Sequence, residues 1–203
     1  VINGSKTFIT NGLNCDLVIV VCKTDPKAGA KGISLIMVEA NRKGFRRGRK
    51  LDKVGQRAAD TAELFFDDVR VPVSNRLGEP GKGFSYLMNE LAQERFAIAV
   101  SSAAQLEAAL DHTLTYVKER KAFDQTVWDF QNTKFKLADI KAQATAVRIM
   151  SDPNLGENMS RGLTLQGAVG AKLLATETLG KALGGMDQLH GDYYYMLGYP
   201  VAR

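Results

Sequence analysis

The feature that most constrains the fold of this chain is a change of pattern near Gly78. Before it, short runs of β-branched and apolar residues alternate with turn dipeptides, which is typical of strands. After it, apolar residues recur at three- and four-residue intervals over long stretches, which is the period of an amphipathic helix. We therefore expect two domains, one of strands at residues 1–77 and one of helices at residues 78–203.

The first 77 residues contain three strand candidates. They lie at residues 17–22, at residues 32–38 and in the segment 62–72, which ends in proline. The turn dipeptide Asn3-Gly4 is expected to separate two short extended pieces as a hairpin would. Short strands without intervening helices favour a small antiparallel barrel or sandwich.

Three helices are expected after the glycine-rich loop at residues 78–83. The first covers roughly residues 84–120, the second 131–150 and the third 163–183, with a polar connection at 151–156. Their wide apolar faces and many alanines predict an antiparallel bundle with close helix approach. The predicted fold class is therefore α+β, with a barrel or sandwich domain followed by a helical bundle.

Composition excludes several classes of protein. The longest apolar stretch falls far short of the ~20 residues that span a bilayer. The net charge of +5 favours anionic ligands but is too small to indicate a nucleic-acid partner. Cys15 and Cys22 are placed on opposite faces of one expected strand, so we expect no disulfide between them and no metal site. The chain begins at Val1 rather than Met, so we expect its original N-terminus to lie outside this sequence.

Glu94 and Arg95 interrupt an otherwise apolar stretch of the first predicted helix. A carboxylate among apolar residues can be partly desolvated, which raises its pKa toward the range of a general base. Arg95 could then hold an anion or tune the carboxylate. The alternative is that the two residues form a surface or interhelix ion pair.

Two further clusters lie at helix ends. The basic cluster at residues 118–124 either complements the dipole of the first helix or reaches the phosphates of a nucleotide cofactor. His190 and the tyrosines that follow it come directly after the third predicted helix. This aromatic group could stack on a flat ring or pack at an interface.

Several segments, taken together, resemble the acyl-CoA dehydrogenase family. They follow the family order and spacing over essentially the whole chain, so the joint resemblance is specific although each motif alone is weak. The matching segments lie at residues 1–12, 53–61, 65–72, 81–84, 119–123, 130–131, 188–191 and 199–203.

The resemblance implies an FAD-dependent enzyme of fatty-acid or branched-chain oxidation. In this family a glutamate removes the α-proton of an acyl-CoA thioester, and the flavin accepts the β-hydrogen as hydride, giving a trans-2-enoyl-CoA. The thioester oxygen is bonded by a backbone N–H at the base and by the flavin ribityl 2′-hydroxyl. Both hydrogen bonds stabilise the negative charge that develops on the thioester oxygen as the enolate forms.

The resemblance also assigns the substrate site. One family position for the base lies in a Tyr-x-Gly-Thr-like segment, which this chain does not contain. The other lies on the long helix directly before an arginine, and Glu94 matches it, in the pattern of the long-chain type. Glu94 is therefore the expected catalytic base and Arg95 a stabilising residue of the site. The expected lining of the acyl channel is Phe84, Leu87, Met88 and Leu91.

The expected FAD contacts follow the family motifs residue by residue. Phe8 and Thr10 would lie beside the flavin ring, and Phe8 stands where the family usually has tryptophan. Asp124, Asp192 and Tyr194 replace glycines that are usual in the family, and Asp192 adds negative charge near a diphosphate. The remaining expected contacts are Arg120 at the pyrophosphate, Phe123 and Gln131 nearby in a dimer-related site, and Gln188 and Gly191 at the adenosine side.

The resemblance covers a middle β-domain and most of a C-terminal helical domain. The family's N-terminal helical domain, the loop that begins its β-domain and its final helix have no counterpart here. The implied partners are acyl-CoA, an electron-transfer flavoprotein and sister subunits of a homotetramer built as a dimer of dimers. The implied location is bacterial cytoplasm or mitochondrial matrix. Two alternatives stay open: a flavin-less scaffold or assembly protein of the same fold, and a flavin acyl-CoA oxidase.

Overall fold

A computed structural model describes residues 1–160 and 162–199 and has the predicted α+β class. Close packing divides the chain into two units, Val1–Asn89 and Glu90–Arg203, and the division falls inside the first helix. The domain boundary expected between residues 77 and 78 stays a prediction. The strands of the first part of the chain are β1 (Ile2–Thr10), β2 (Leu17–Lys23), β3 (Ile33–Glu39), β4 (Phe45–Lys50), β5 (Thr61–Val69) and the two-residue β6 (Arg76–Leu77). The α-helices are α1 (Gly83–Glu119), α2 (Gln131–Ser160) and α3 (Leu165–His190).

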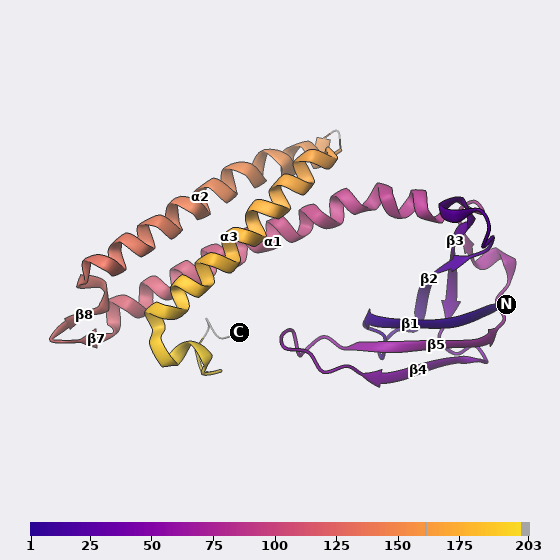
Figure 1. Ribbon diagram of the computed structural model, residues 1–203, viewed down its shortest axis with the longest axis horizontal. Helices are drawn as coiled ribbons and strands as arrows, with labels where there is room; N and C mark the ends of the chain where they lie inside the picture. The colour runs from indigo at the N-terminus through magenta and orange to yellow at the C-terminus, as the bar shows by residue number, and fades with distance from the viewer. Residues whose placement is uncertain (161, 200–203) are drawn as a thin grey trace. The chain divides into compact units, whose positions relative to one another are not determined.

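The strand unit is a sandwich of two antiparallel three-stranded sheets. One sheet has the order β1-β5-β4 and the other β2-β3-β6 (Figure 1). Alternate residues of both sheets point inward and share one apolar core. Among the described residues β1 and β2 do not pair, so the barrel form of the prediction is wrong and the sandwich form is confirmed. The core residues are Ile2, Val20, Val38, Leu64, Phe66 and Val69.

The first segment differs from its predicted hairpin. β1 is one strand that runs through Gly4, where φ is +138° and the register with β5 shifts. Glycine adopts this backbone angle without steric cost, so the dipeptide bends a strand rather than ending it. Cys15 lies before β2 and not within it, and both Cys15 and Cys22 are free thiols.

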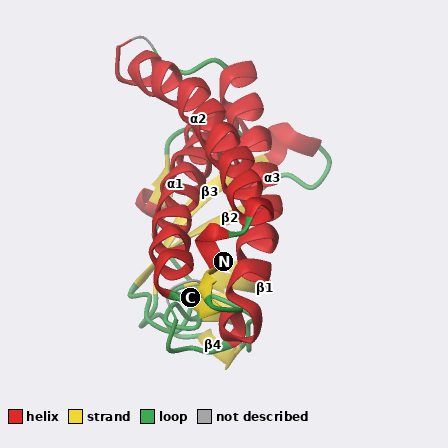
Figure 2. Ribbon diagram, turned by 90° about the vertical axis from the view of Figure 1, so that its left-hand side faces the viewer, coloured by secondary structure: helices red, strands yellow, loops and turns green. Residues whose placement is uncertain are grey.

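The helical unit is a bundle in which α1, α2 and α3 lie side by side (Figure 1 and Figure 2). A small hairpin of β7 (Lys121–Ala122) and β8 (Gln125–Thr126) connects α1 to α2. The buried face of α3 is built largely from alanines, which allow the close approach that the sequence predicts. Its buried alanines are Ala168, Ala171, Ala175 and Ala182.

The second helix is longer than predicted. α2 continues to Ser160 and contains Pro153, so the polar connection expected at residues 151–156 is wrong. Proline lacks the N–H that would bond the carbonyl of Ile149 in the preceding turn. The next carbonyl, that of Met150, accepts from the side chain of Asn154 at 2.7 Å. None of the helices in residues 1–160 and 162–199 has the length and apolarity that crossing a membrane requires.

The glycine-rich segment before α1 is a loop, as predicted, and packs on the strand unit. The N–H of Gly81 donates to the hydroxyl of Ser34 at 3.0 Å. Gly81 has a φ of +75°, and a Cβ there would stand 2.3 Å from the carbonyl oxygen of Lys31. The close backbone contact therefore requires glycine.

Candidate functional site

The start of α1 presents large apolar side chains to the surface. Phe84, Leu87 and Met88 are 36–44% exposed, and Leu91 one turn later is half-buried. Their spacing of three and four residues places them on one face of the helix. This stripe is the predicted lining of the acyl channel, and its exposure leaves it available for an apolar ligand.

Glu94 continues this helical face, because it lies seven residues, almost two full turns, after Leu87. The described residues leave its side chain exposed, so they do not desolvate the carboxylate in the way the sequence suggested. No ion pair joins Glu94 to Arg95 in the described structure, and Arg95 is half-buried. The surface ion-pair alternative therefore has no support from geometry, and the role of Glu94 as a base stays a prediction.

Phe8 has an unusual backbone conformation within β1. Its φ is +60°, and it lies where the register with β5 shifts between Lys6 and Ile9. A left-handed residue other than glycine costs about 1–3 kcal/mol, and a bulge redirects the side chain it carries. The ring of Phe8 is 77% exposed as a result, and Thr10 follows it on the same exposed segment. Both observations fit the predicted contact with a flat ring.

A cavity of about 710 Å³ lies at the end of the helical bundle where α1 stops and α3 ends. It brings together four of the residues predicted to hold the cofactor, although they come from two separate segments of the chain. These four are Arg120, Phe123, Gln188 and Gly191. Gln131 does not line this cavity.

The turn that carries Phe123 explains its exposure. Phe123 and Asp124 are the two central residues of the β7–β8 hairpin, with φ of +53° and +63°. Two-residue hairpins favour this mirror-image turn, in which both central residues have positive φ. Phe123 is consequently 89% exposed, and its ring edge contacts Phe130 at a centroid distance of 6.4 Å.

Tyr116 and His190 form an aromatic pair that lines this cavity. The rings of Tyr116 and His190 stack at a centroid distance of 4.4 Å, and the Tyr116 hydroxyl donates to the His190 carbonyl at 3.2 Å. His190 is 4% exposed and its Nδ1 donates to the Met186 carbonyl at 3.0 Å, because a carbonyl can only accept. Burial raises the pKa of the Tyr116 hydroxyl despite the nearby Arg120. Sequence reasoning missed Tyr116, although its position one helical turn before Arg120 could have indicated it.

The cavity suits a phosphate-containing ligand. Arg120 is exposed, and its guanidinium lies 5.5 Å from the centre of the Tyr193 ring. A guanidinium can bind phosphate oxygens through two parallel hydrogen bonds. Gly191 adds open backbone, since no described atom lies within 4 Å of where a Cβ would stand. Asp192 also lines the cavity, and its negative charge would repel a phosphate group.

Asp192 also interacts with Tyr195. Tyr195 hydrogen-bonds its carboxylate, and burial together with this bond raises the pKa of the Tyr195 hydroxyl. Tyr194 lines an adjoining hollow with Asp187 and does not line the cavity of Arg120, whereas Asp192 lines both. Of the three replacements of family glycines, Asp192 is therefore the one that lines the cavity of Arg120, and Asp124 and Tyr194 do not.

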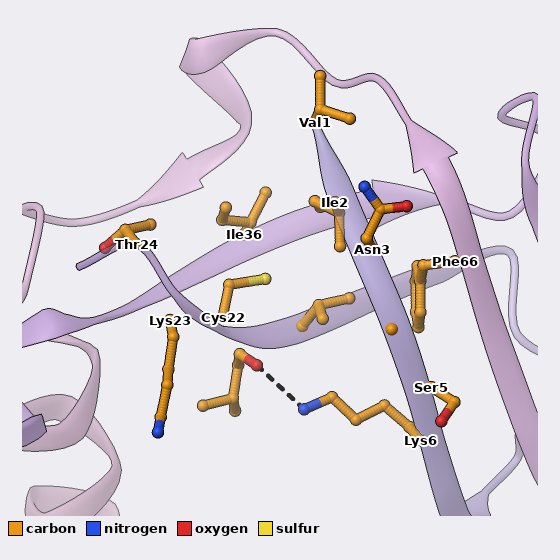
Figure 3. A pocket seen from close by; sticks show the side chains of 13 residues that line it. Val1, Ile2, Asn3, Ser5, Lys6, Cys22, Lys23, Thr24, Ile36 and Phe66 are labelled. Carbon is orange, nitrogen blue, oxygen red and sulfur yellow. Dashed lines mark hydrogen bonds between the residues drawn. The ribbon is translucent and has the colours of Figure 1, made fainter. Parts of the chain in front are cut away.

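A second cavity of about 600 Å³ lies in the strand unit between β1 and β2 (Figure 3). Ile2, Ile36 and Phe66 contribute to its apolar lining, and Lys6 donates to the Val21 carbonyl at 3.0 Å. Burial raises the pKa of the Cys22 thiol there, against the weaker effect of Lys6. A protonated thiol is a poor nucleophile. None of the predicted site residues lines this cavity.

Two family models match the chain. The model described as acyl-CoA dehydrogenase, C-terminal domain, matches residues 81–203, and the one described as acyl-CoA dehydrogenase, middle domain, matches residues 1–69. Together they span both structural units.

Individual relatives agree with the family models. The chain is 47% identical over its whole length to the mitochondrial long-chain specific acyl-CoA dehydrogenase of Sus scrofa, and 38% identical to the short-chain specific acyl-CoA dehydrogenase of Megasphaera elsdenii. It spans 48% and 53% of these two proteins, about half of each. A crystal structure of an acyl-CoA dehydrogenase from Geobacillus kaustophilus superimposes on 99% of the chain with a TM-score of 0.95 and 46% identity, using 53% of that structure.

Proposed function

This chain belongs to the acyl-CoA dehydrogenase family, and on that premise we propose that its full-length protein is an FAD-dependent acyl-CoA dehydrogenase. The observation that carries the proposal is the helical face of α1, where an exposed apolar stripe leads directly to Glu94. The proposed reaction is α,β-dehydrogenation of an acyl-CoA thioester to a trans-2-enoyl-CoA. The identity with a long-chain specific relative supports fatty-acid oxidation as its setting.

In the proposed reaction Glu94 is the general base. Its carboxylate takes the α-proton of the thioester and becomes a carboxylic acid, and the C–H electrons form the new double bond. Bound substrate would replace water around the exposed carboxylate, which raises its proton affinity. Arg95, the next residue in the sequence, would stabilise the site through its positive charge. Phe84, Leu87, Met88 and Leu91 would bind the acyl chain.

FAD, when bound, supplies the acceptor for the β-hydrogen and its electron pair. Each of the two units contains residues of a kind that could bind part of this cofactor. In the strand unit, Phe8 and Thr10 would lie against the flavin ring. In the helical unit, Arg120 would bind the diphosphate, and Gln188 and Gly191 the adenosine side. Phe123 and Gln131 complete the proposed set.

The proposed partners follow from the family. An electron-transfer flavoprotein would receive the electrons, and the protein would assemble as a homotetramer. The basic cluster and the cavity at the end of α1 support a cofactor site that includes residues remote from Glu94. Bacterial cytoplasm and the mitochondrial matrix are the two proposed locations.

The base is tested by Glu94→Gln in the full-length protein. The amide keeps the size of the side chain but cannot accept a proton, so we expect the rate of flavin bleaching by a long-chain acyl-CoA to fall about 10²–10⁴-fold. FAD content and thermal unfolding should stay unchanged. Glu90→Gln, one helical turn earlier and also exposed, is the matched control. An undiminished bleaching rate in Glu94→Gln would show that another group is the base.

The absorbance spectrum of the purified full-length protein separates the alternatives. A flavin spectrum that bleaches on addition of acyl-CoA supports the dehydrogenase or the oxidase, and repeating the assay with and without oxygen separates these two. A colourless protein that takes up no added FAD would instead support the scaffold.

A further inference from the structure

Tyr116 touches two parts of the cavity at once. Its side chain stacks on His190 and donates to the His190 carbonyl, at the end of α3. Its own carbonyl accepts the N–H of Arg120 at 2.9 Å, at the end of α1. The imidazole ring of His190 is also held in place by its own hydrogen bond, because its Nδ1 donates to the Met186 carbonyl. One residue therefore links the ends of two helices that both line the cavity.

The bonded carbonyl belongs to the peptide that joins His190 to Gly191. A peptide group is planar, so holding its C=O also fixes the direction of the Gly191 N–H and the start of the following segment. Gly191 has φ of +60° and ψ of −141°, and the chain leaves α3 here. Such a glycine has many accessible conformations, which makes an external contact valuable for selecting one. A tyrosine hydroxyl is protonated near neutral pH and able to donate, and burial raises the pKa of Tyr116 further.

We propose that Tyr116 is a positioning residue that holds the His190–Gly191 peptide in the orientation needed to bind the adenosine side of FAD. This inference rests on the proposed function. Tyr116 acts through the backbone of its neighbour and is not itself the contact. Removal of its hydroxyl should therefore weaken recognition of the adenosine half of the cofactor and leave recognition of the flavin half unchanged.

The test compares FAD with FMN on the full-length protein stripped of cofactor. FMN carries the flavin ring and one phosphate but lacks the adenosine. Tyr116→Phe keeps the stacked ring and removes only the hydroxyl. We expect its dissociation constant for FAD to rise about three- to tenfold, the effect of one hydrogen bond. Its dissociation constant for FMN should stay within twofold of wild type. Binding is followed by quenching of flavin fluorescence.

Tyr86→Phe is the matched control. Tyr86 lies on the same helix, and its hydroxyl also makes a backbone hydrogen bond, accepting from the N–H of Glu79 at 3.0 Å. This variant should bind FAD and FMN as wild type does. Tyr116→His keeps a flat ring that can stack on His190, but its shorter side chain does not reach the His190 carbonyl, so this second variant should also lose the FAD preference.

The outcomes separate this inference from the proposed function. Equal losses for FAD and FMN in Tyr116→Phe would overturn it, because they indicate general destabilisation. An unchanged preference for FAD would overturn it as well, with the dehydrogenase proposal still standing. A wild-type protein that binds neither flavin would overturn both. If Tyr116→Phe does not fold, loss of the FAD preference in Tyr116→His relative to Tyr86→Phe decides the question.

Discussion

Glu39, at the end of β3, joins three segments of the strand unit through a single carboxylate. Nε and Nη2 of Arg42 each donate to it at 2.8 Å, and the Asn75 amide donates at 3.0 Å. These bonds favour the ionised form, with Arg42 the largest contribution, and lower the pKa of Glu39 to about 2. The same amide of Asn75 donates to the Met37 carbonyl at 2.9 Å, so the carboxylate also orders the approach to β6.

The Glu39 carboxylate makes the free energy of unfolding depend on pH. Because the folded pKa lies below the unfolded value of about 4.5, the stabilisation is present above that value and is lost as pH falls toward 2. We expect the free energy of unfolding to fall less steeply between pH 5 and pH 2 in Glu39→Gln than in wild type. Urea unfolding at several pH values measures this. Glu79→Gln, on the exposed loop, is the control, and an equal slope in all three proteins would contradict the prediction.

Elements with a clear hydrophobic period were predictable from sequence, and those held by tertiary contacts were not. The start and end of α1 follow its period closely. β4 was missed because its sequence is largely basic and lacks alternation. It pairs with β5, and its one aromatic residue, Phe45, packs edge-on against Phe66 at 5.4 Å. Among candidate site residues, the family resemblance indicated Arg120 and Gly191. Tyr116 lies one helical turn before Arg120, but its contact with His190 at the end of α3 is seen only in the structure.

Pro153 offers a test at the scale of one helix. Proline inside a helix is about 3 kcal/mol less favourable than alanine, although less near a helix end. We therefore expect Pro153→Ala to raise the free energy of unfolding by about 1–3 kcal/mol, measured by urea denaturation. Lys141→Ala, exposed on the same helix, should change it by less than about 0.5 kcal/mol. A Pro153→Ala protein of unchanged or lower stability would show that α2 does not run through this position.

The whole molecule has two separate apolar cores. Leu64 is fully buried in the core of the sandwich, and Leu106 is fully buried in the core of the helical bundle. The two clusters share no residue among those described. Stability is therefore expected to be divided between the units rather than uniform.

Hydrogen exchange followed by mass spectrometry tests this division. Truncation of a buried leucine to alanine costs about 2–5 kcal/mol. Leu64→Ala should accelerate amide exchange in β1–β5 and leave α2 and α3 protected, and Leu106→Ala should do the reverse. Equal acceleration in both units from either variant would indicate one cooperative structure.

The length of α1 has a genetic consequence. Glu94 and Arg120 lie about 39 Å apart along the helix axis, farther than one FAD molecule extends. If both residues serve the proposed reaction, they would serve different cofactor molecules, and each cofactor would be shared between two copies of the chain. Two inactive alleles, one altered at Glu94 and the other at Arg120, would then complement each other. In a mixed dimer one of the two sites receives both of its normal residues.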